Sequence, residues 1–288
     1  MIDFHTHPVL IREFVSKYPD YERSARDIFG IGNNFQPLET FFLQMDVAHI
    51  DRAVLLPIEC SRARGVAVST NDQVSELCGM SDRFIGFASV DPDRQGAVKE
   101  LEHAIRDLGL HGLKLDPALQ DFDSTGNAAM DVYAAAEGLG IPLLIHTGMS
   151  WAPGTAIGRG KPVDLEPAIR RFPELNFVLA HFGWPWVWET VALMMKYPNV
   201  YADTSGLYYD SPHEFFQFVF REQIPVTIIE RSLRNRVVFG SNYPRVEIKN
   251  MVRALHSLPL TEGCRELILR ENAERLLPKA TSQAGVRR

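Results

Sequence analysis

The sequence is poor in cysteine and contains no long apolar run, and both shortages narrow the class of protein. Its three cysteines, Cys60, Cys78 and Cys264, are scattered and form no Cys-x-x-Cys pair, which argues against a disulfide framework and against a zinc site built from thiolates. No stretch of about 18 apolar residues occurs, and Asp3 and His5 interrupt the amino-terminal residues. We therefore expect a cytoplasmic protein without a signal peptide or a membrane anchor.

An excess of basic residues is also lacking. The 30 Lys and Arg residues are outnumbered by 36 Asp and Glu residues, which gives a formal net charge of -6. Such a chain has no positive field that would favour the phosphate backbone of a nucleic acid. We expect a small-molecule substrate as its partner, with no nucleic acid and no membrane.

The chain does contain a regular alternation of apolar runs with amphipathic stretches of helical length. The runs are rich in Val, Ile, Leu and Phe and predict buried parallel strands, and the stretches between them predict helices. Eight strands are expected, at Ile2–His7, Ala53–Ile58, Phe84–Val90, Gly112–Asp116, Pro142–His146, Asn176–His181, Val200–Thr204 and Arg236–Ser241. The helices are expected at Leu38–His49, Asn71–Met80, Gly96–Leu108, Asn127–Leu139, Asp164–Arg171, Trp186–Tyr197, Pro212–Glu230 and Val246–Ser257.

Eight such units predict an α/β fold, the (β/α)8 TIM barrel, with residues 1–280 as a single domain. A further helix at Cys264–Leu277 is expected to pack outside the barrel, and residues 281–288 are expected to form a flexible tail. The alternative is a doubly wound open sheet. That fold usually carries a glycine-rich phosphate turn after its first strand, whereas here the turn is His-Thr-His-Pro.

Polar residues stand at the predicted strand ends, where a (β/α)8 barrel carries its chemistry. Strand alternation places His5 and His7 on one face together with Asp3, and places Ile2 and Phe4 on the opposite face. If His146 points into the barrel, the same alternation directs Leu143 and Ile145 toward the surrounding helices. If Lys114 points into the barrel, Leu113 and Leu115 face the helices as well. His181 and Asn242 end two further strands.

Histidines at three separate strand ends predict a divalent metal site. One such histidine is most often a satisfied core or rim residue, but stability does not require several at one end of a barrel. A metal ion needs converging neutral nitrogens and an open position for water. Zinc is the first choice because it suits nitrogen-rich sites, and manganese or iron are the alternatives where oxygen ligands contribute.

An ordered set of motifs carries a family resemblance. These motifs are Asp-Phe-His5-Thr-His7, Gly-Leu-Lys114-Leu, Ile-His146-Thr-Gly, Leu-Ala-His181-Phe-Gly, Tyr-Ala-Asp203-Thr-Ser-Gly, Phe-Gly-Ser-Asn242-Tyr-Pro and Asn272-Ala-Glu-Arg-Leu-Leu. The sequence resembles the amidohydrolase superfamily, in the amidohydrolase-related branch that includes aminocarboxymuconate semialdehyde decarboxylase, resorcylate-type decarboxylases, oxalomesaconate hydratase and pyrone dicarboxylate lactonase. The resemblance implies that His5, His7 and His146 hold one metal ion and that His181 handles the proton beside it.

One position departs from the family pattern. The family normally has an aspartate at the end of strand eight, which binds the metal and takes a proton from water, and this chain has Asn242. An amide oxygen can coordinate weakly but has neither the charge nor the basicity of a carboxylate. We therefore expect Asn242 as a weak ligand, His181 as the base, and Asp203 or Asp116 as the source of the missing charge. The alternative is that Asn242 marks a degraded site, which binds a small molecule but no longer catalyses a reaction.

Other residues are candidates for substrate contacts. Lys114 either holds a substrate carboxylate or Asp116, or is carboxylated and bridges two metals, as the resemblance allows. Arg159 and Arg245 are candidates for binding a carboxylate. Trp184 could wall a ring-shaped substrate or fill the core.

Three functions remain open. The first is metal-dependent hydrolysis of a small carboxylate-bearing or ring-containing ester, lactone or amide, with water activated by the metal. The second is non-oxidative decarboxylation of an aromatic or enoic acid. The third is non-catalytic binding of a small molecule, because of Asn242. A homodimer is compatible with each of them.

Overall fold

The computed structural model describes residues 1–31, 35–206 and 211–277, so the predicted tail at 281–288 lies outside the described residues. Eight parallel strands are present, each at a predicted position but shorter than predicted. Their bounds are β1 (Ile2–Thr6), β2 (Arg52–Leu55), β3 (Phe84–Gly86), β4 (Leu113–Leu115), β5 (Leu143–Ile145), β6 (Phe177–Leu179), β7 (Val200–Asp203) and β8 (Val237–Val238).

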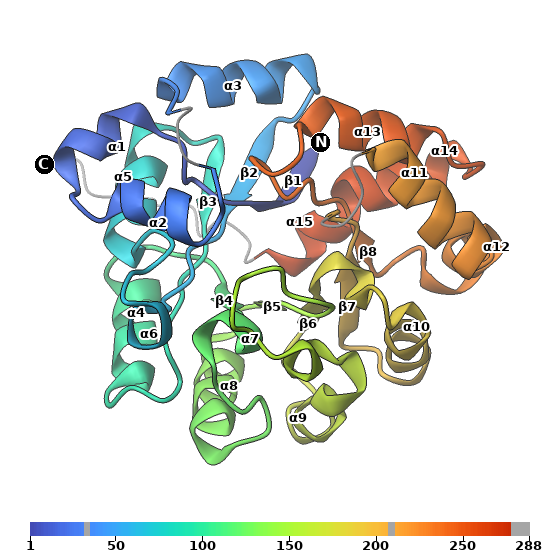
Figure 1. Ribbon diagram of the computed structural model, residues 1–288. Coiled ribbons are helices and arrows are strands. Elements are labelled where there is room, and N and C mark those ends of the chain that lie inside the picture. Colours follow the sequence, from blue (N-terminus) through green and yellow to red (C-terminus); the bar gives the residue numbers. More distant parts are fainter. Residues whose placement is uncertain (32–34, 207–210, 278–288) are drawn as a thin grey trace, which may run out of the picture.

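The strands close into a (β/α)8 barrel, as predicted, with the helices around it (Figure 1). The ladder runs β1-β2-β3 and β4-β5-β6-β7-β8. A bridge between Ala88 and Leu113 joins β3 to β4. The other seam is closed by the Phe4 N–H, which donates to Phe239 O at 2.8 Å, and by a bridge between Thr6 and Tyr243.

The α-helices alternate with the strands along the chain. Their bounds are α1 (Arg12–Lys17), α2 (Tyr21–Asp27), α3 (Leu38–Val47), α4 (Ser61–Arg64), α5 (Asn71–Met80), α6 (Ala97–Arg106), α7 (Pro117–Gln120), α8 (Asn127–Leu139), α9 (Glu166–Arg171), α10 (Val187–Lys196), α11 (Pro212–Gln217), α12 (Val226–Ile228), α13 (Ile248–His256), α14 (Glu262–Glu266) and α15 (Asn272–Leu276). Within the described ranges, no helix combines the length and the apolar character needed to cross a membrane.

The prediction of a single helix over Pro212–Glu230 is wrong, because the helix is interrupted before Pro225. Helix α11 continues through a π-helical segment, Phe218–Gln223, and Ile224 is then extended, with φ -123° and ψ 137°. Proline has no N–H to continue the helix and disfavours helical torsions at the preceding residue. A new helix, α12, starts at Val226.

The alternation predicted for β4 and β5 is confirmed. For β1, His5 and His7 do point the same way, but the expectation that Ile2 and Phe4 face the opposite side is wrong. The apolar cluster between the strands and the helices contains the predicted outward-facing residues Leu113, Leu115, Leu143 and Ile145. Ile2 and Phe4, however, pack with Val54, Leu144 and Val178 inside the barrel. The β1–β2 register shifts between Asp3 and Thr6, and such a bulge lets His5 also face the interior. Asp3 Oδ1 accepts from Ser241 N at 2.9 Å and from His5 N at 3.2 Å, so its carboxylate lies between the first histidine and the residues that follow β8.

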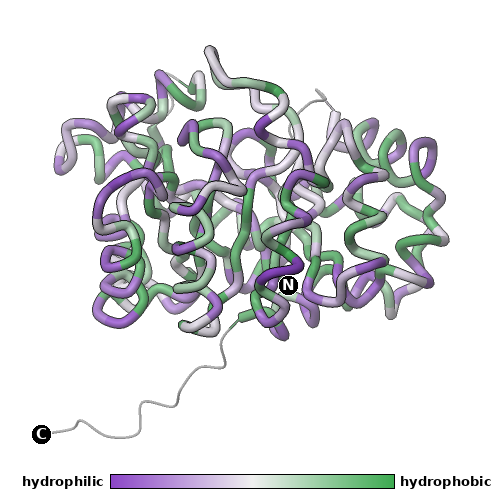
Figure 2. Tube along the Cα trace, turned by 90° about the horizontal axis from the view of Figure 1, so that it is seen from below, coloured by the Kyte–Doolittle hydropathy of each residue, from purple (hydrophilic) through white to green (hydrophobic). Residues whose placement is uncertain are grey.

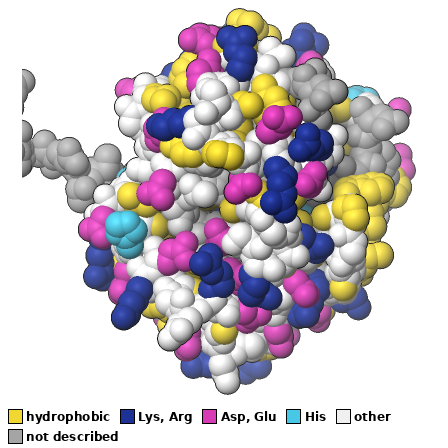
Figure 3. Space-filling model, turned by 60° about the vertical axis from the view of Figure 1, so that its left-hand side comes forward, with side chains coloured by type: hydrophobic (Ala, Val, Ile, Leu, Met, Phe, Trp, Pro, Cys, Tyr) yellow, Lys and Arg dark blue, Asp and Glu magenta, His cyan; other side chains and the backbone are white. Residues whose placement is uncertain are grey.

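The carboxy-terminal helix is predicted to pack outside the barrel, but its last residues also reach the barrel interior. Ala273, Leu276 and Leu277 belong to the apolar cluster inside the barrel. Asn272 Nδ2 donates to Arg234 O at 2.7 Å and to Val237 O at 2.8 Å, at the start of β8. Helix α15 therefore closes the end of the barrel where the strands begin. Figure 2 shows hydrophobic segments concentrated in the middle of the molecule, and Figure 3 shows basic and acidic side chains interspersed on one face.

Candidate active site

Two histidines, His5 in β1 and His7 just after it, direct their Nε2 atoms at each other. The His5 Nε2 and His7 Nε2 atoms lie 3.2 Å apart. His5 Nδ1 lies 2.7 Å from Asp203 Oδ2, and His7 Nδ1 lies 2.8 Å from Leu56 O. Because a carboxylate and a carbonyl only accept, both Nδ1 atoms carry the proton and both Nε2 atoms present lone pairs. Two facing lone pairs cannot hydrogen bond, but they suit a shared cation.

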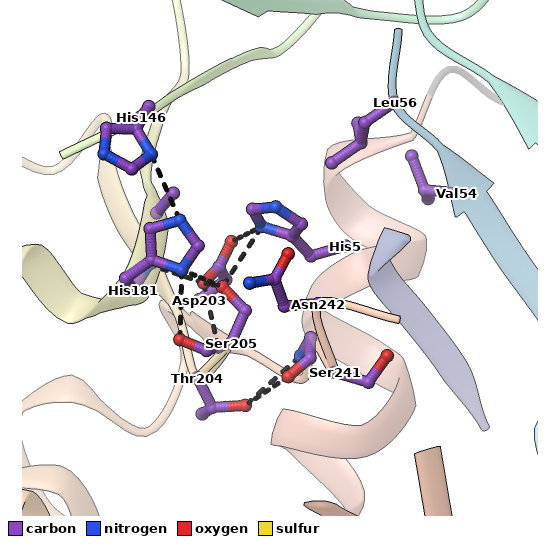
Figure 4. Close-up of polar contacts among 12 residues, drawn as sticks. His5, Val54, Leu56, His146, His181, Asp203, Thr204, Ser205, Ser241 and Asn242 are labelled. Carbon is purple, nitrogen blue, oxygen red and sulfur yellow. Dashed lines mark hydrogen bonds and ion pairs between the residues drawn. The ribbon is translucent and has the colours of Figure 1, made fainter. Parts of the chain in front are cut away.

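The strand-end sequence Asp203-Thr-Ser205 holds this arrangement together. Asp203 Oδ1 accepts from His181 N at 2.8 Å, from Ser205 N at 3.0 Å and from the Ser205 hydroxyl. The Ser205 Oγ atom lies 2.7 Å from His181 Nδ1 and 3.1 Å from His5 Nδ1. In Figure 4 the rings of His5 and His181 flank Asp203 and Ser205, and His146 lies beyond His181. Ser205 was missed from the sequence, where it is only part of a motif.

His181 follows β6 in an unusual backbone conformation. His181 and Phe182 have φ of 58° and 49°, and Gly183 continues at 68°. This left-handed region costs roughly 1 to 2 kcal/mol for a residue other than glycine. The bond from His181 N to Asp203 and the burial of Phe182 stabilise it. The turn brings His181 Nε2 to 3.2 Å from His146 Nδ1, at the end of β5.

His146 presents a further nitrogen. Its Nε2 is buried and has no hydrogen-bond partner among the described residues. Its Nδ1 also lies 3.6 Å from Asp116 Oδ2. The Oδ1 atom of Asp116 caps α7 by accepting from Ala118 N and Leu119 N. A buried, unpaired imidazole nitrogen beside the others fits a metal-binding role.

Asn242 lies at the end of β8 with φ 64°, a left-handed conformation that Asn tolerates. Its Nδ2 donates to Gly206 O at 3.1 Å, so Oδ1 is the amide atom left to act as a ligand. The preceding Gly240 is required by close packing, because a Cβ there would lie 2.7 Å from His5 Cβ. The glycine in Phe-Gly-Ser-Asn therefore lets β8 approach the first histidine.

Burial sets the charge state of the site. It lowers the pKa of His5, His7 and His181 well below the usual imidazole value, and it also lowers the pKa of His146. Neutral imidazoles are the form that a metal ion requires. Burial also lowers the pKa of Lys114 to about 8, although Asp116 and Asp203 act in the opposite direction. The Lys114 amine has no hydrogen bond or ion pair among the residues that the structure describes.

These groups line one cavity of about 470 Å³. The four histidines and Asn242 lie on it together with Lys114, Asp116 and Arg245. Its apolar wall consists of Ile28, Phe29, Ile58, Leu119, Trp151 and Ala152. The Arg245 guanidinium lies over the Phe29 ring, 4.6 Å from its centre. The wall comes from segments that follow several strands, and no motif in the sequence indicated Phe29 or Trp151 as cavity residues.

Two predicted substrate-binding residues are not part of this cavity's lining. Arg159 donates to Phe122 O at 3.0 Å and lies 3.4 Å from Asp121 Oδ1, in a surface pocket lined by Ser124 and Asp164. Trp184 packs against the core outside the barrel. The tryptophan on the cavity is Trp151.

The predicted ligand set is only partly gathered. His5 and His7 are together, whereas His146 is paired with His181. Among the described residues, one group has donor atoms that all lie within 4.8 Å of one another, namely His5, His181 and Asp203. The ring centroids of His5 and His181 lie 4.9 Å apart. This contact joins the His5–His7 pair to the His146–His181 pair, so the four rings form one continuous row from His7 to His146.

Comparison with known proteins covers nearly the whole chain. A family model described as amidohydrolase matches residues 2–279. Gamma-resorcylate decarboxylase from Rhizobium radiobacter is 25% identical over 277 residues, which cover 83% of this chain and 83% of that protein.

Solved structures share the fold. A probable 2-pyrone-4,6-dicarboxylic acid hydrolase from Acinetobacter baumannii, with citric acid bound, has a TM-score of 0.65 and 16% identity, and the match covers 96% of this chain and 98% of that one. A 5-carboxyvanillate decarboxylase from Novosphingobium aromaticivorans, with bound manganese and 3-methoxy-4-hydroxy-5-nitrobenzoic acid, has a TM-score of 0.63 and 18% identity, with 96% of each chain covered. These relatives are enzymes, either decarboxylases or a hydrolase.

Proposed function

This chain belongs to the amidohydrolase family, and on that premise we propose that it is a metal-dependent decarboxylase of a ring-shaped carboxylic acid, such as a hydroxylated benzoate. The observation that carries the proposal is the pair of His5 and His7 Nε2 atoms, 3.2 Å apart in a cavity that also contains Lys114. The decarboxylases among the relatives favour this chemistry over hydrolysis.

The metal ligands would be His5 and His7, joined by His146 and the amide oxygen of Asn242. Their nitrogen-rich set suits Zn²⁺, and Mn²⁺ is an alternative because a related decarboxylase contains it. When bound, a divalent cation supplies Lewis-acid stabilisation of negative charge on the substrate. His5 and His7 are held for this role by Asp203 and Leu56 O.

The cavity offers both cationic and apolar contacts for the substrate. Lys114 and Arg245 would bind a carboxylate or a phenolate oxygen. Phe29, Ile58 and Trp151 would pack against the ring and exclude water. We assign no substrate contact to Arg159 or Trp184, because neither lines the cavity.

His181 would handle the proton. Decarboxylation breaks the bond between the ring carbon and the carboxylate, releases carbon dioxide and adds a proton to that carbon. His181 Nε2 faces the other histidines, whereas Nδ1 is held by Ser205. Nε2 is therefore the nitrogen that would carry the proton to the substrate. Asp203 would position His5 and His181, because both of its oxygens are already hydrogen-bonded.

Hydrolysis of an ester or lactone is the second candidate. It uses the same residues, with His181 Nε2 accepting the proton from the attacking water. The similarity of the fold to a probable pyrone dicarboxylic acid hydrolase favours keeping it. Asn242 bears on both candidates, because an amide is a weaker base than the aspartate usual at this strand end.

A substrate panel tests the proposal. Purified protein is analysed for metal, loaded with Zn²⁺ or Mn²⁺, and incubated with hydroxybenzoates and with lactones of ring acids. We expect release of carbon dioxide from at least one hydroxybenzoate, and loss of it in His181→Gln, with Arg159→Gln as the matched control. Lactone turnover without carbon dioxide would select hydrolysis, and tight binding of an acid without turnover would select a binding protein.

We also propose that the protein works in the cytoplasm, where its cysteines stay reduced. Cys60, Cys78 and Cys264 are free in the structure. The homodimer compatible with the sequence remains a prediction, which sedimentation of the purified protein would test.

A further inference from the structure

The hydroxyl of Ser205 stands between the site's carboxylate and two of its imidazoles. It is buried and contacts Asp203 Oδ1, His181 Nδ1 at 2.7 Å and His5 Nδ1 at 3.1 Å. A hydroxyl has one proton to donate and two lone pairs that accept. An ionised carboxylate only accepts, so the Ser205 proton points to Asp203 and its lone pairs point to the histidines.

This orientation decides where His181 keeps its proton. With the Ser205 lone pairs facing it, His181 Nδ1 must be the protonated nitrogen of the neutral ring. The backbone Ser205 O atom, 3.1 Å away, can only accept and acts in the same direction. His181 Nε2 is then left bare and directed toward His146.

We propose that Ser205 is a positioning residue that keeps His181 in the tautomer with a bare Nε2 and links it to Asp203. The hydrogen bond from His181 Nδ1 to Ser205 Oγ and the bond from the Ser205 hydroxyl to Asp203 Oδ1 fix the orientation of the imidazole ring. This role rests on the proposed function, in which His181 moves the proton. Ser205 itself is not among the residues that line the cavity, and it acts through His5 and His181, which are.

The tautomer is tested without any turnover. Full-length protein with ¹⁵N-labelled histidine is studied by NMR at about pH 8, where an ordinary imidazole is neutral, with and without Zn²⁺. His181→Gln assigns the signals. We expect a protonated Nδ1 and a bare Nε2 on His181. A His181 protonated at Nε2 would overturn the inference, whatever the panel of substrates shows.

The substitution Ser205→Ala tests the link to Asp203. We expect kcat to fall roughly 3- to 10-fold, because the hydrogen bond that orients His181 is lost, with KM within about twofold. Metal content should not change, and the Nε2–H form of His181 should become detectable. Thr204→Val is the matched control, because it removes a buried neighbouring hydroxyl that bonds to Gly240 and touches no histidine. Equal kcat values in Ser205→Ala and Thr204→Val would overturn the inference.

Discussion

At the scale of single residues, Asn242 stands where the family resemblance predicts an aspartate, and its contacts define a test. Its Nδ2 donates to Gly206 O at 3.1 Å. A carboxylate cannot make this bond, but it would bring a full negative charge to the proposed metal ligands. Asp tolerates the left-handed backbone as Asn does, so the exchange adds no backbone strain.

We therefore expect Asn242→Asp to bind Zn²⁺ or Mn²⁺ roughly tenfold more tightly, because affinity rises with the charge of the ligands. Competition with a metal-binding dye measures this. Asn250→Asp, on the surface of α13, should leave the affinity unchanged. A decrease in both metal affinity and turnover in Asn242→Asp would contradict this expectation. It would mean that the site requires the amide of Asn242.

At the scale of elements, α7 is held in place by one buried side chain. Gln120 Nε2 donates to Glu59 O and Val90 O, each at 2.9 Å, and its Oε1 accepts from Asp116 N at 2.7 Å. These bonds join α7 to the segments that follow β2, β3 and β4. The same helix brings Leu119 to the cavity wall.

Removing this side chain should destabilise the protein. Gln120→Ala leaves three buried backbone groups without partners, and we expect the free energy of unfolding to fall by about 2 to 4 kcal/mol. Urea denaturation followed by circular dichroism measures it. Gln95→Ala, in an exposed turn, should change it by less than about 0.5 kcal/mol. Equal midpoints for the two variants would refute the role given to Gln120.

The positions of the strands and most helices were predictable, because apolar periodicity reports directly on burial. The bulge in β1 was not, since it depends on how β8 and Asp3 meet that strand. The interruption of the helix before Pro225 was predictable from the proline alone, because proline has no N–H to donate. His5, His7, His146 and His181 were found as strand-end residues. The acceptors that orient them, Leu56 O and Ser205, depend on packing across strands distant in sequence.

At the scale of the whole molecule, the proposed metal ties together parts of the barrel far apart in the chain. A ligand that binds only the folded state, at 100 times its dissociation constant, stabilises it by about 2.7 kcal/mol. For a chain of 288 residues that corresponds to a Tm change of roughly 4 to 5 °C. We expect excess chelator to lower Tm by this amount. His5→Ala should show no change with chelator, and an unchanged Tm in the metal-loaded parent protein would contradict the site.

The last described turn of the chain has a consequence for how the molecule is made. Leu276 and Leu277 share one apolar cluster with Ile2 and Phe4, and strands between them in the sequence contribute Val54, Leu144 and Val178 to it. The interior of the barrel is therefore completed only when the first strand and the last described helix come together during folding. Until then, Ile2 and Phe4 lack part of their apolar packing.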